Sequence, residues 1–197
     1  MRSKKELRAA GRAARDALTV AERKEKSDRI AEKLYAMKEY READAIAVYV
    51  SFESEVETHA LIEHALQDGK RFFCPKVLSV PEGKMEFYEC VGGTGTLTQF
   101  LPRIGRPGEP PEKCVSVPVP LTHSSCNVLF LIPGLAFNPD GARIGFGGGF
   151  YDRYLSRFKC PPGGRVHTVA LSFACQVFEE PFPETEEDVR MQVILTE

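Results

Sequence analysis

The sequence predicts an α/β fold, a three-layer sandwich in which helices cover both faces of a mostly parallel sheet. Short apolar segments rich in β-formers alternate along the chain with longer segments of helical periodicity. Twice, a strand, a helix and a second strand follow one another, an order that requires parallel strands joined by a right-handed crossover. The length suits one domain that spans residues 1–197.

Two helices are predicted before the first strand. Small and apolar residues recur at helical spacing over 3–17, which predicts the first helix. Thr19 followed by Glu22 is a capping-box pattern, so we expect the second helix to begin there, with Ile30, Leu34 and Met37 on its apolar face.

The first strand–helix–strand unit follows these helices. Residues 45–50 have the composition of a buried strand, 51–57 form a polar loop, and 58–67 form a helix. The second strand of the unit spans 71–74, and we expect Pro75 to end it because proline cannot donate to a sheet ladder.

The second half contains a long loop and another such unit. Residues 91–121 are rich in Gly, Pro, Thr and Ser, so we expect an ordered loop with one or two short edge strands. The other predicted elements are strands at 85–90, 128–132, 167–173 and 192–195 and a helix at 151–158.

The composition is that of a soluble globular protein, and the net charge of −2 gives no general attraction to nucleic acid or membranes. The six cysteines contain no C-x-x-C pair, and no signal peptide or membrane-length apolar run precedes them. We therefore expect reduced thiols, a cytoplasmic location and no Cys/His metal site.

Positive charge is concentrated near the N-terminus, where six basic residues and one acid lie between Arg2 and Arg15. They form either a solvated basic face or a first turn that carries Lys4 and Arg8 to a polyphosphate. A nucleic-acid-binding arm is disfavoured because the cations lie on one helix without interleaved aromatic residues.

The most informative stretch is 142–155, which contains four glycines, three of them consecutive at 147–149. Because glycine lacks Cβ, its N–H groups can turn toward one point and approach a ligand closely. A helix that begins after such a run adds free N–H groups and a partial positive charge. A flexible surface turn is the alternative, but Arg143, Tyr151 and Asp152 around the run favour a phosphate site.

Two common phosphate loops do not match this stretch. A dinucleotide fingerprint that starts at Gly145 needs glycine where the chain has Phe150. A P-loop needs lysine and then serine or threonine after its last glycine, but Gly149 is followed by Phe150 and Tyr151. We therefore expect a different type of phosphate loop.

Ligands of open α/β sheets bind beyond the carboxyl ends of the strands. This rule brings the loops 51–57 and 143–151 to one site and makes Glu55 and Asp152 candidates for shared chemistry. Glu55 has the alternative role of an acid at the approach to a helix, and Asp152 that of a first-turn carboxylate favoured by the helix dipole.

A comparison of magnitudes indicates what else the phosphate site needs. The charge effect of a helix terminus contributes about 0.3–1 kcal/mol, whereas micromolar binding needs roughly 8 kcal/mol. Cations and a metal are therefore expected, and the chain offers Lys4, Arg8 and Arg143 as cations. Asp152 suits Mg²⁺, which prefers one or two carboxylates with phosphate oxygens and water, and Asp188 is a candidate second ligand.

Together, these motifs resemble the 5-formyltetrahydrofolate cyclo-ligase family, also called 5,10-methenyltetrahydrofolate synthetases, over nearly the whole chain. The resemblance is carried by Lys4-x-x-x-Arg8, Glu55-Val56-Glu57-Thr58, Leu131-Ile132-Pro133-Gly134-Leu135-Ala136-Phe137, Arg143-Ile144-Gly145-x-Gly147-x-Gly149-Phe150-Tyr151-Asp152, Asp188 and Thr196-Glu197. The glycine motif is the most specific of them.

The resemblance implies a monomeric α/β enzyme that uses ATP and Mg²⁺ to convert 5-formyltetrahydrofolate and its polyglutamates into 5,10-methenyltetrahydrofolate, with release of ADP and phosphate. It implies no nucleic-acid or membrane partner. It assigns ATP to Lys4, Arg8, Arg143, Ile144, Gly145, Phe146, Gly147, Gly148, Gly149, Phe150 and Tyr151, and Mg²⁺ to Asp152 and Asp188. It assigns the folate to Val50, Glu55, Phe146, Gly147, Gly148, Gly149 and Phe150.

The chemistry of this reaction is consistent with those residues. An amide oxygen is a poor leaving group, so phosphorylation of the formyl oxygen converts it to phosphate before N10 attacks and the ring closes. Positioning and charge neutralisation matter more here than a protein nucleophile. We expect Arg143 and Tyr151 to act in catalysis, and Glu55 to hold the pterin or handle a proton. Phe52 or Tyr151 is our hypothesis for a stacking partner of the flat ring.

Two positions depart from the family pattern. Several relatives carry lysine at Gly148, and the tail often has a second aspartate where this chain has Gln192. Phosphate contacts at Gly148 must then come from the backbone or from the cations named above, and the two remaining aspartates must suffice for the metal. The competing function is a non-catalytic folate- or nucleotide-binding protein of the same fold.

Overall fold

Six strands form one sheet in the order β3-β2-β1-β4-β7-β8 in the computed structural model, which describes residues 2–89, 127–160 and 162–197. The strands are β1 Ala45–Val48, β2 Arg71–Ser79, β3 Lys84–Glu89, β4 Val128–Ile132, β7 Val166–Leu171 and β8 Val193–Leu195. Every pairing is parallel except that of β2 with β3. The chain leaves β1 toward β2 and leaves β4 toward β7, so the strand order reverses between β1 and β4. Ligands of open α/β sheets bind beyond the carboxyl ends of the strands at such a reversal.

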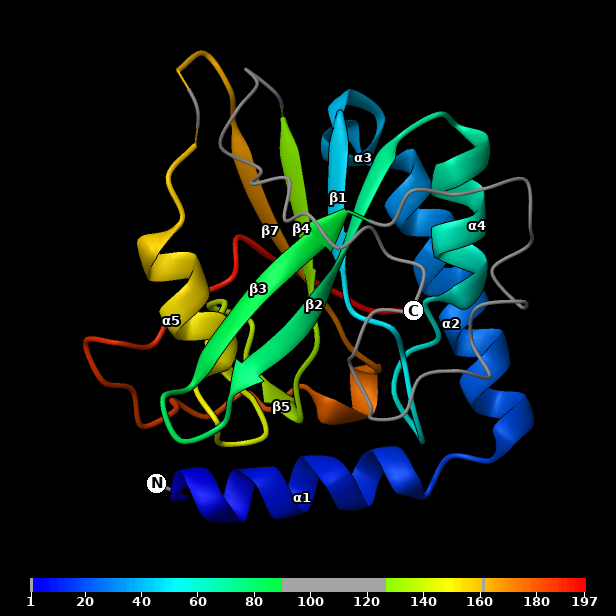
Figure 1. Cartoon of the computed structure of the whole chain (residues 1–197). Coiled ribbons are helices and arrows are strands. Elements are labelled where there is room, and N and C mark those ends of the chain that lie inside the picture. The colour runs from blue at the N-terminus through cyan, green and yellow to red at the C-terminus, as the bar shows by residue number, and fades with distance from the viewer. Residues whose placement is uncertain (1, 90–126, 161) are drawn as a thin grey trace.

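Helices cover both faces of the sheet, which confirms the predicted three-layer sandwich (Figure 1). One face carries α2 (Val20–Ala36), α3 (Lys38–Glu42) and α4 (His59–Gln67), and the other carries α5 (Phe150–Arg157). Ile30 and Leu34 of α2 are fully buried, as predicted. On the opposite face, Phe130 of β4 packs against Tyr154 and Phe158. The five-residue α3 was not predicted because it is too short to show a periodic pattern.

Helix α1 (Lys4–Asp16) covers neither face and instead runs across the end of the sheet at which β2 ends (Figure 1). A reciprocal capping box between Ser3 and Glu6 fixes its first turn. Gly11 packs directly on backbone, since a Cβ there would lie 1.9 Å from the carbonyl oxygen of Leu135. This close approach holds α1 against the segment that follows β4.

A short hairpin of β5 (Ala136–Phe137) and β6 (Arg143–Ile144) lies between β4 and the glycine loop. Neither it nor the 3₁₀ helix η4 (Ala174–Gln176) was predicted, because two or three residues do not establish a periodicity. The glycine loop, residues 145–149, connects β6 directly to α5.

The prediction that Pro75 ends β2 was wrong. Among the residues that the structure describes, β2 pairs with β1 only as far as Phe73, and its later residues pair with β3 alone, with Pro75 opposite Phe87. Proline is tolerated on such an edge because one side of the strand needs no donor. The first strand ends at Val48, two residues earlier than predicted.

Part of the prediction lies outside the described residues, namely the ordered loop and the edge strands expected at 91–121. Within the described ranges, no helix combines the length and hydropathy that crossing a membrane requires.

Candidate active site

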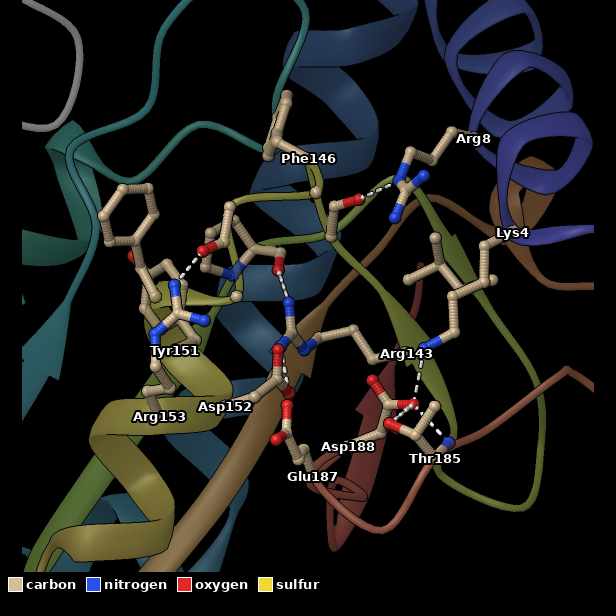
Figure 2. A pocket seen from close by; sticks show the side chains of 17 residues that line it. Lys4, Arg8, Arg143, Phe146, Tyr151, Asp152, Arg153, Thr185, Glu187 and Asp188 are labelled. Atoms are coloured by element: carbon tan, nitrogen blue, oxygen red, sulfur yellow. Dashed lines mark hydrogen bonds and ion pairs between the residues drawn. The ribbon is translucent and has the colours of Figure 1, made fainter. Parts of the chain in front are cut away.

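A cavity of about 300 Å³ lies where the start of α1, the glycine loop, the start of α5 and the segment 185–188 meet (Figure 2). All residues predicted to contact ATP or Mg²⁺ line it: Lys4, Arg8, Arg143, Ile144, Gly145, Phe146, Gly147, Gly148, Gly149, Phe150, Tyr151, Asp152 and Asp188. Segments from both ends of the chain therefore meet at the glycine loop. We refer to this space as the polar cavity.

The glycine loop has backbone angles that other residues rarely adopt. Gly147 has a φ of 103° and Gly149 a φ of 63°, both in the left-handed region. Gly149 is the N-cap of α5, and no side chain of the described residues caps the helix there. The N–H groups of the first turn of α5 thus remain for a ligand, and the positive end of the helix dipole favours an anion.

Lys4 and Arg8 reach the polar cavity from α1. The Lys4 ammonium lies 2.5 Å from a carboxylate oxygen of Asp188, and the Arg8 guanidinium donates to the carbonyl of Gly145 at 2.9 Å. Burial acts to raise the pKa of Asp188, but the contact with Lys4 and the N–H and hydroxyl donors of Thr185 lower it overall. Asp188 is therefore ionised at neutral pH, as a metal ligand must be.

Arg143 lies at the centre of the polar cavity (Figure 2). Its buried side chain forms a 2.8 Å salt bridge with Asp152 and donates to the carbonyl of Pro133. Its Nε has no hydrogen-bond partner among the described residues, so one donor of a buried cation is left for a ligand. The Tyr151 ring lies 5.8 Å from the guanidinium, and burial raises the pKa of Tyr151, so its hydroxyl stays protonated.

Asp152 and Asp188 are suited to hold Mg²⁺ together with a nucleotide. Asp152 accepts a hydrogen bond from the N–H of Val189 at 3.3 Å, which joins it to the segment that carries Asp188. The described residues contain no cluster of three or more His, Cys, Asp or Glu side chains placed to bind a metal. Mg²⁺ does not need one, because it completes its shell with phosphate oxygens and water. The donor set therefore fits a metal that binds with phosphate.

A second cavity, of about 130 Å³, adjoins the first, and we call it the apolar cavity. Pro133, Phe146, Phe150 and Tyr151 line both cavities. The predicted folate residues Val50, Phe52 and Glu55 also line the apolar cavity, whereas Gly147, Gly148 and Gly149 line only the polar one. The rings of Phe52 and Phe146 lie 6.3 Å apart, centroid to centroid. Apolar walls with few polar groups are typical of a site for a flat organic ring.

Glu55 supplies a buried carboxyl group to the apolar cavity. Its Oε2 accepts from the N–H of Phe52 at 3.3 Å, and the guanidinium of Arg15 lies 4.0 Å from its Oε1. Burial raises the pKa of Glu55 to about 7, although the Phe52 donor and the charge of Arg15 act in the opposite direction. Near neutral pH this group can both take up and release a proton.

Several residues at the site were not predicted. Arg153, Thr185 and Glu187 line the polar cavity, and Tyr49, Pro75, Val77 and Met85 line the apolar cavity. Arg15, which lies beside Glu55, was not predicted either, although its helical spacing from Arg8 and Arg12 was an available signal. The residues of β2 and β3 carried no such signal. Gln192, which replaces a family aspartate, lines neither cavity, and its side chain instead accepts from the N–H of Thr168 at 2.9 Å.

Similar proteins are known for the whole length of this chain. The profile of the 5-formyltetrahydrofolate cyclo-ligase family matches residues 1–197. The chain is 29% identical to the mouse 5-formyltetrahydrofolate cyclo-ligase over 99% of its own length and 94% of that protein. It is 30% identical to the protein of that name from Escherichia coli K12, over 92% and 93% of the two lengths. The NMR structure of Aquifex aeolicus 5,10-methenyltetrahydrofolate synthetase matches with a TM-score of 0.71 and 26% identity, over 98% of this chain and 88% of that chain.

Proposed function

Because this chain belongs to the 5-formyltetrahydrofolate cyclo-ligase family, we propose that it uses ATP and Mg²⁺ to convert 5-formyltetrahydrofolate into 5,10-methenyltetrahydrofolate, ADP and phosphate. The observation that carries this proposal is the pair of adjoining cavities, one lined by four cations and the other mostly apolar with a buried carboxyl group. A triphosphate suits the first and a pterin suits the second. The shared wall of Phe146, Phe150 and Tyr151 would bring the two reactants into contact.

The reaction has two steps. The formyl oxygen attacks the γ-phosphorus, the bond from that phosphorus to the β-phosphate oxygen breaks, and ADP leaves with the electron pair. N10 then adds to the activated carbon and loses its proton, the carbon–oxygen bond breaks, and phosphate leaves the methenyl cation behind. The first step depends on positioning and charge neutralisation, which Arg8, Arg143 and the N–H groups of the glycine loop would supply.

Three side chains are placed for catalytic roles. Arg143 is held by Asp152 and keeps a free Nε for a phosphoryl oxygen. Tyr151 has a protonated hydroxyl at the wall between the cavities and donates to the transferred group. Glu55 orients the pterin or accepts the N10 proton, for which a pKa of about 7 is well matched.

The charge of the polar cavity supports a requirement for metal. Its described lining residues include four cations and three carboxylates, Asp152, Glu187 and Asp188, so their excess positive charge is small compared with the negative charge of a nucleotide triphosphate. Mg²⁺ held by Asp152 and Asp188 would neutralise phosphate charge and favour attack at phosphorus.

We also propose a monomer that acts in the cytoplasm as one domain, on the folate and its polyglutamates, without nucleic-acid or membrane partners. The net charge of −2 supports the absence of nucleic-acid and membrane partners. So do Lys4 and Arg8, which line the polar cavity. Arg12, exposed and 5.8 Å from the Phe146 ring, offers a cation for the glutamate carboxylates.

The test is direct. Purified protein is mixed with 5-formyltetrahydrofolate, Mg²⁺ and ATP, and the absorbance of the methenyl product is followed. We expect product only when ATP is present, loss of product in Arg143→Ala, and slower product formation at limiting Mg²⁺ in Asp152→Asn. The competing function, a non-catalytic folate- or nucleotide-binding protein, predicts ligand binding without product.

A further inference from the structure

Four cationic side chains of the described residues line the polar cavity, and they are not equivalent. Lys4 and Arg143 each form an ion pair with an aspartate. Arg8 and Arg153 instead donate to backbone carbonyl groups. A carbonyl carries no net charge, so both guanidiniums keep their full charge for an anionic ligand.

Arg8 and Arg153 approach the glycine loop from opposite sides (Figure 2). Arg8 donates to the carbonyl of Gly145, where the loop begins, and Arg153 donates to that of Gly148, near its end. The Arg153 guanidinium also lies 6.0 Å from the ring of Phe150, which lines both cavities. Arg153 is thus on the side of the loop that adjoins the apolar cavity.

A further contact of Arg153 leads to the same cavity. Its Nε donates at 3.2 Å to the carbonyl of Gly83, in the turn between β2 and β3. Val77 and Met85, in the strands on either side of that turn, line the apolar cavity. Arg153 therefore lines the polar cavity and also contacts Phe150 and the β2–β3 hairpin, both of which contribute residues to the apolar cavity.

We propose that Arg153 is a catalytic residue that contacts the phosphoryl group during its transfer from ATP to the formyl oxygen, an inference that rests on the proposed function. As the bond to ADP breaks and the bond to the formyl oxygen forms, negative charge spreads over three equatorial oxygens. Arg153 exchanges its carbonyl acceptors for these oxygens and forms stronger, charge-assisted hydrogen bonds while keeping all its protons. Arg8, on the far side of the loop, holds the nucleotide.

Steady-state kinetics separate these two roles. We expect Arg153→Met to lower kcat about 100-fold or more, with less than a roughly fivefold change in the KM for ATP. Arg153→Lys keeps the charge without the planar fork and should recover part of the loss. Arg8→Met should mainly raise the KM for ATP. Because Arg153 is exposed, all its variants should keep the unfolding midpoint of the unmodified protein.

Arg157→Met is the matched control. Arg157 lies one turn further along α5 and tethers the same hairpin through the Met85 carbonyl at 2.6 Å, but it does not line the polar cavity. We expect its kcat to stay within about twofold of that of the unmodified protein. An unchanged kcat in Arg153→Met, or an equal loss in Arg157→Met, would overturn the proposal.

A second readout does not involve the folate. ADP with aluminium fluoride mimics the group in transfer, and we expect it to bind the unmodified protein more tightly than ADP alone. Arg153→Met should abolish that difference and leave the affinity for ADP nearly unchanged. Equal tightening in both proteins would contradict the role of Arg153. Absence of product with the unmodified enzyme would instead refute the proposed function.

Discussion

The guanidinium of Arg15 lies 4.0 Å from a carboxylate oxygen of Glu55, and both side chains are buried. This distance is too long for a hydrogen bond, and Nε and Nη2 of Arg15 have no hydrogen-bond partner among the described residues. The charge of Arg15 therefore offsets only part of the effect of burial, and the pKa of Glu55 is raised. The folate side of the proposed site thus contains a coupled acid and cation whose protonation can be measured.

The free energy of unfolding should fall as pH rises across the range in which Glu55 ionises only in the unfolded chain. The pKa of Glu55 rises from an ordinary 4.5 to about 7 on folding, so the folded state binds more protons between these values. The stabilising contribution of Glu55 is fully present below pH 4.5 and is lost as the pH approaches about 7. Between pH 5 and pH 8 we expect the free energy of unfolding, measured in urea, to fall by about 2–3 kcal/mol more in the unmodified protein than in Glu55→Gln. The same slope in both proteins would contradict a raised pKa.

Replacement of Arg15 by methionine should raise the pKa of Glu55 further. The positive charge of Arg15 favours the ionised carboxylate, and its removal leaves the effect of burial less opposed. A ¹³C NMR titration of the Glu55 carboxyl carbon measures the shift. Arg15→Lys keeps the charge and should move the pKa less, while Arg12 and Glu53, the other charged groups that affect Glu55, stay the same in both variants. An unchanged pKa in Arg15→Met would show that the pair is not coupled.

Alanine at position 11 should displace α1 from the site. Its Cβ would lie 1.9 Å from the backbone oxygen of Leu135, so the helix must shift. We expect Gly11→Ala to cost about 1–3 kcal/mol of stability and to weaken ATP binding, because Lys4 and Arg8 move with the helix. Ala13→Ser, at an exposed position of the same helix, should cost only about 0.5 kcal/mol. Urea unfolding and calorimetric titration with ATP test both effects, and unchanged values for Gly11→Ala would refute this packing.

Asp152→Asn should raise the Mg²⁺ concentration that gives half-maximal activity by about tenfold or more. Asparagine keeps an acceptor for Arg143 but removes the negative charge that binds the metal. The measurement is a Mg²⁺ titration of the initial rate at saturating ATP and folate. Asp140→Asn, at an exposed position outside the polar cavity, is the control and should leave the titration unchanged. A titration of Asp152→Asn that matches this control would remove Asp152 from the metal site.

Sequence patterns predicted the elements whose signals are local. The capping box at Thr19 and Glu22 marks the start of α2, and the uninterrupted apolar run 128–132 marks β4. The end of β2 was missed because it depends on which strand pairs with each side of Pro75, and that pairing is not visible in the sequence. The same holds for the two-residue strands of the β5–β6 hairpin.

The site was predicted best where its residues are contiguous. The stretch from Arg143 to Asp152 combines glycines, a cation and a carboxylate in one segment, so its chemistry can be inferred from composition alone. Arg153 directly follows that segment, yet its position depends on a carbonyl at Gly83, 70 residues away in sequence. Arg15 likewise matters at the site because it lies beside the buried Glu55. The helical spacing of Arg15 does not reveal which segments bury Glu55.

In the proposed complex the nucleotide phosphates bind at the glycine loop beside the apolar cavity. The most direct test of this binding mode is an NMR titration of the backbone amides with a non-hydrolysable ATP analogue and Mg²⁺. We predict the largest shifts at the amides of residues 145–149 and at the first turn of α5, with smaller shifts near Lys4 and Arg8. Saturable binding that leaves the amides of 145–149 unshifted while others move would show that the phosphates bind elsewhere.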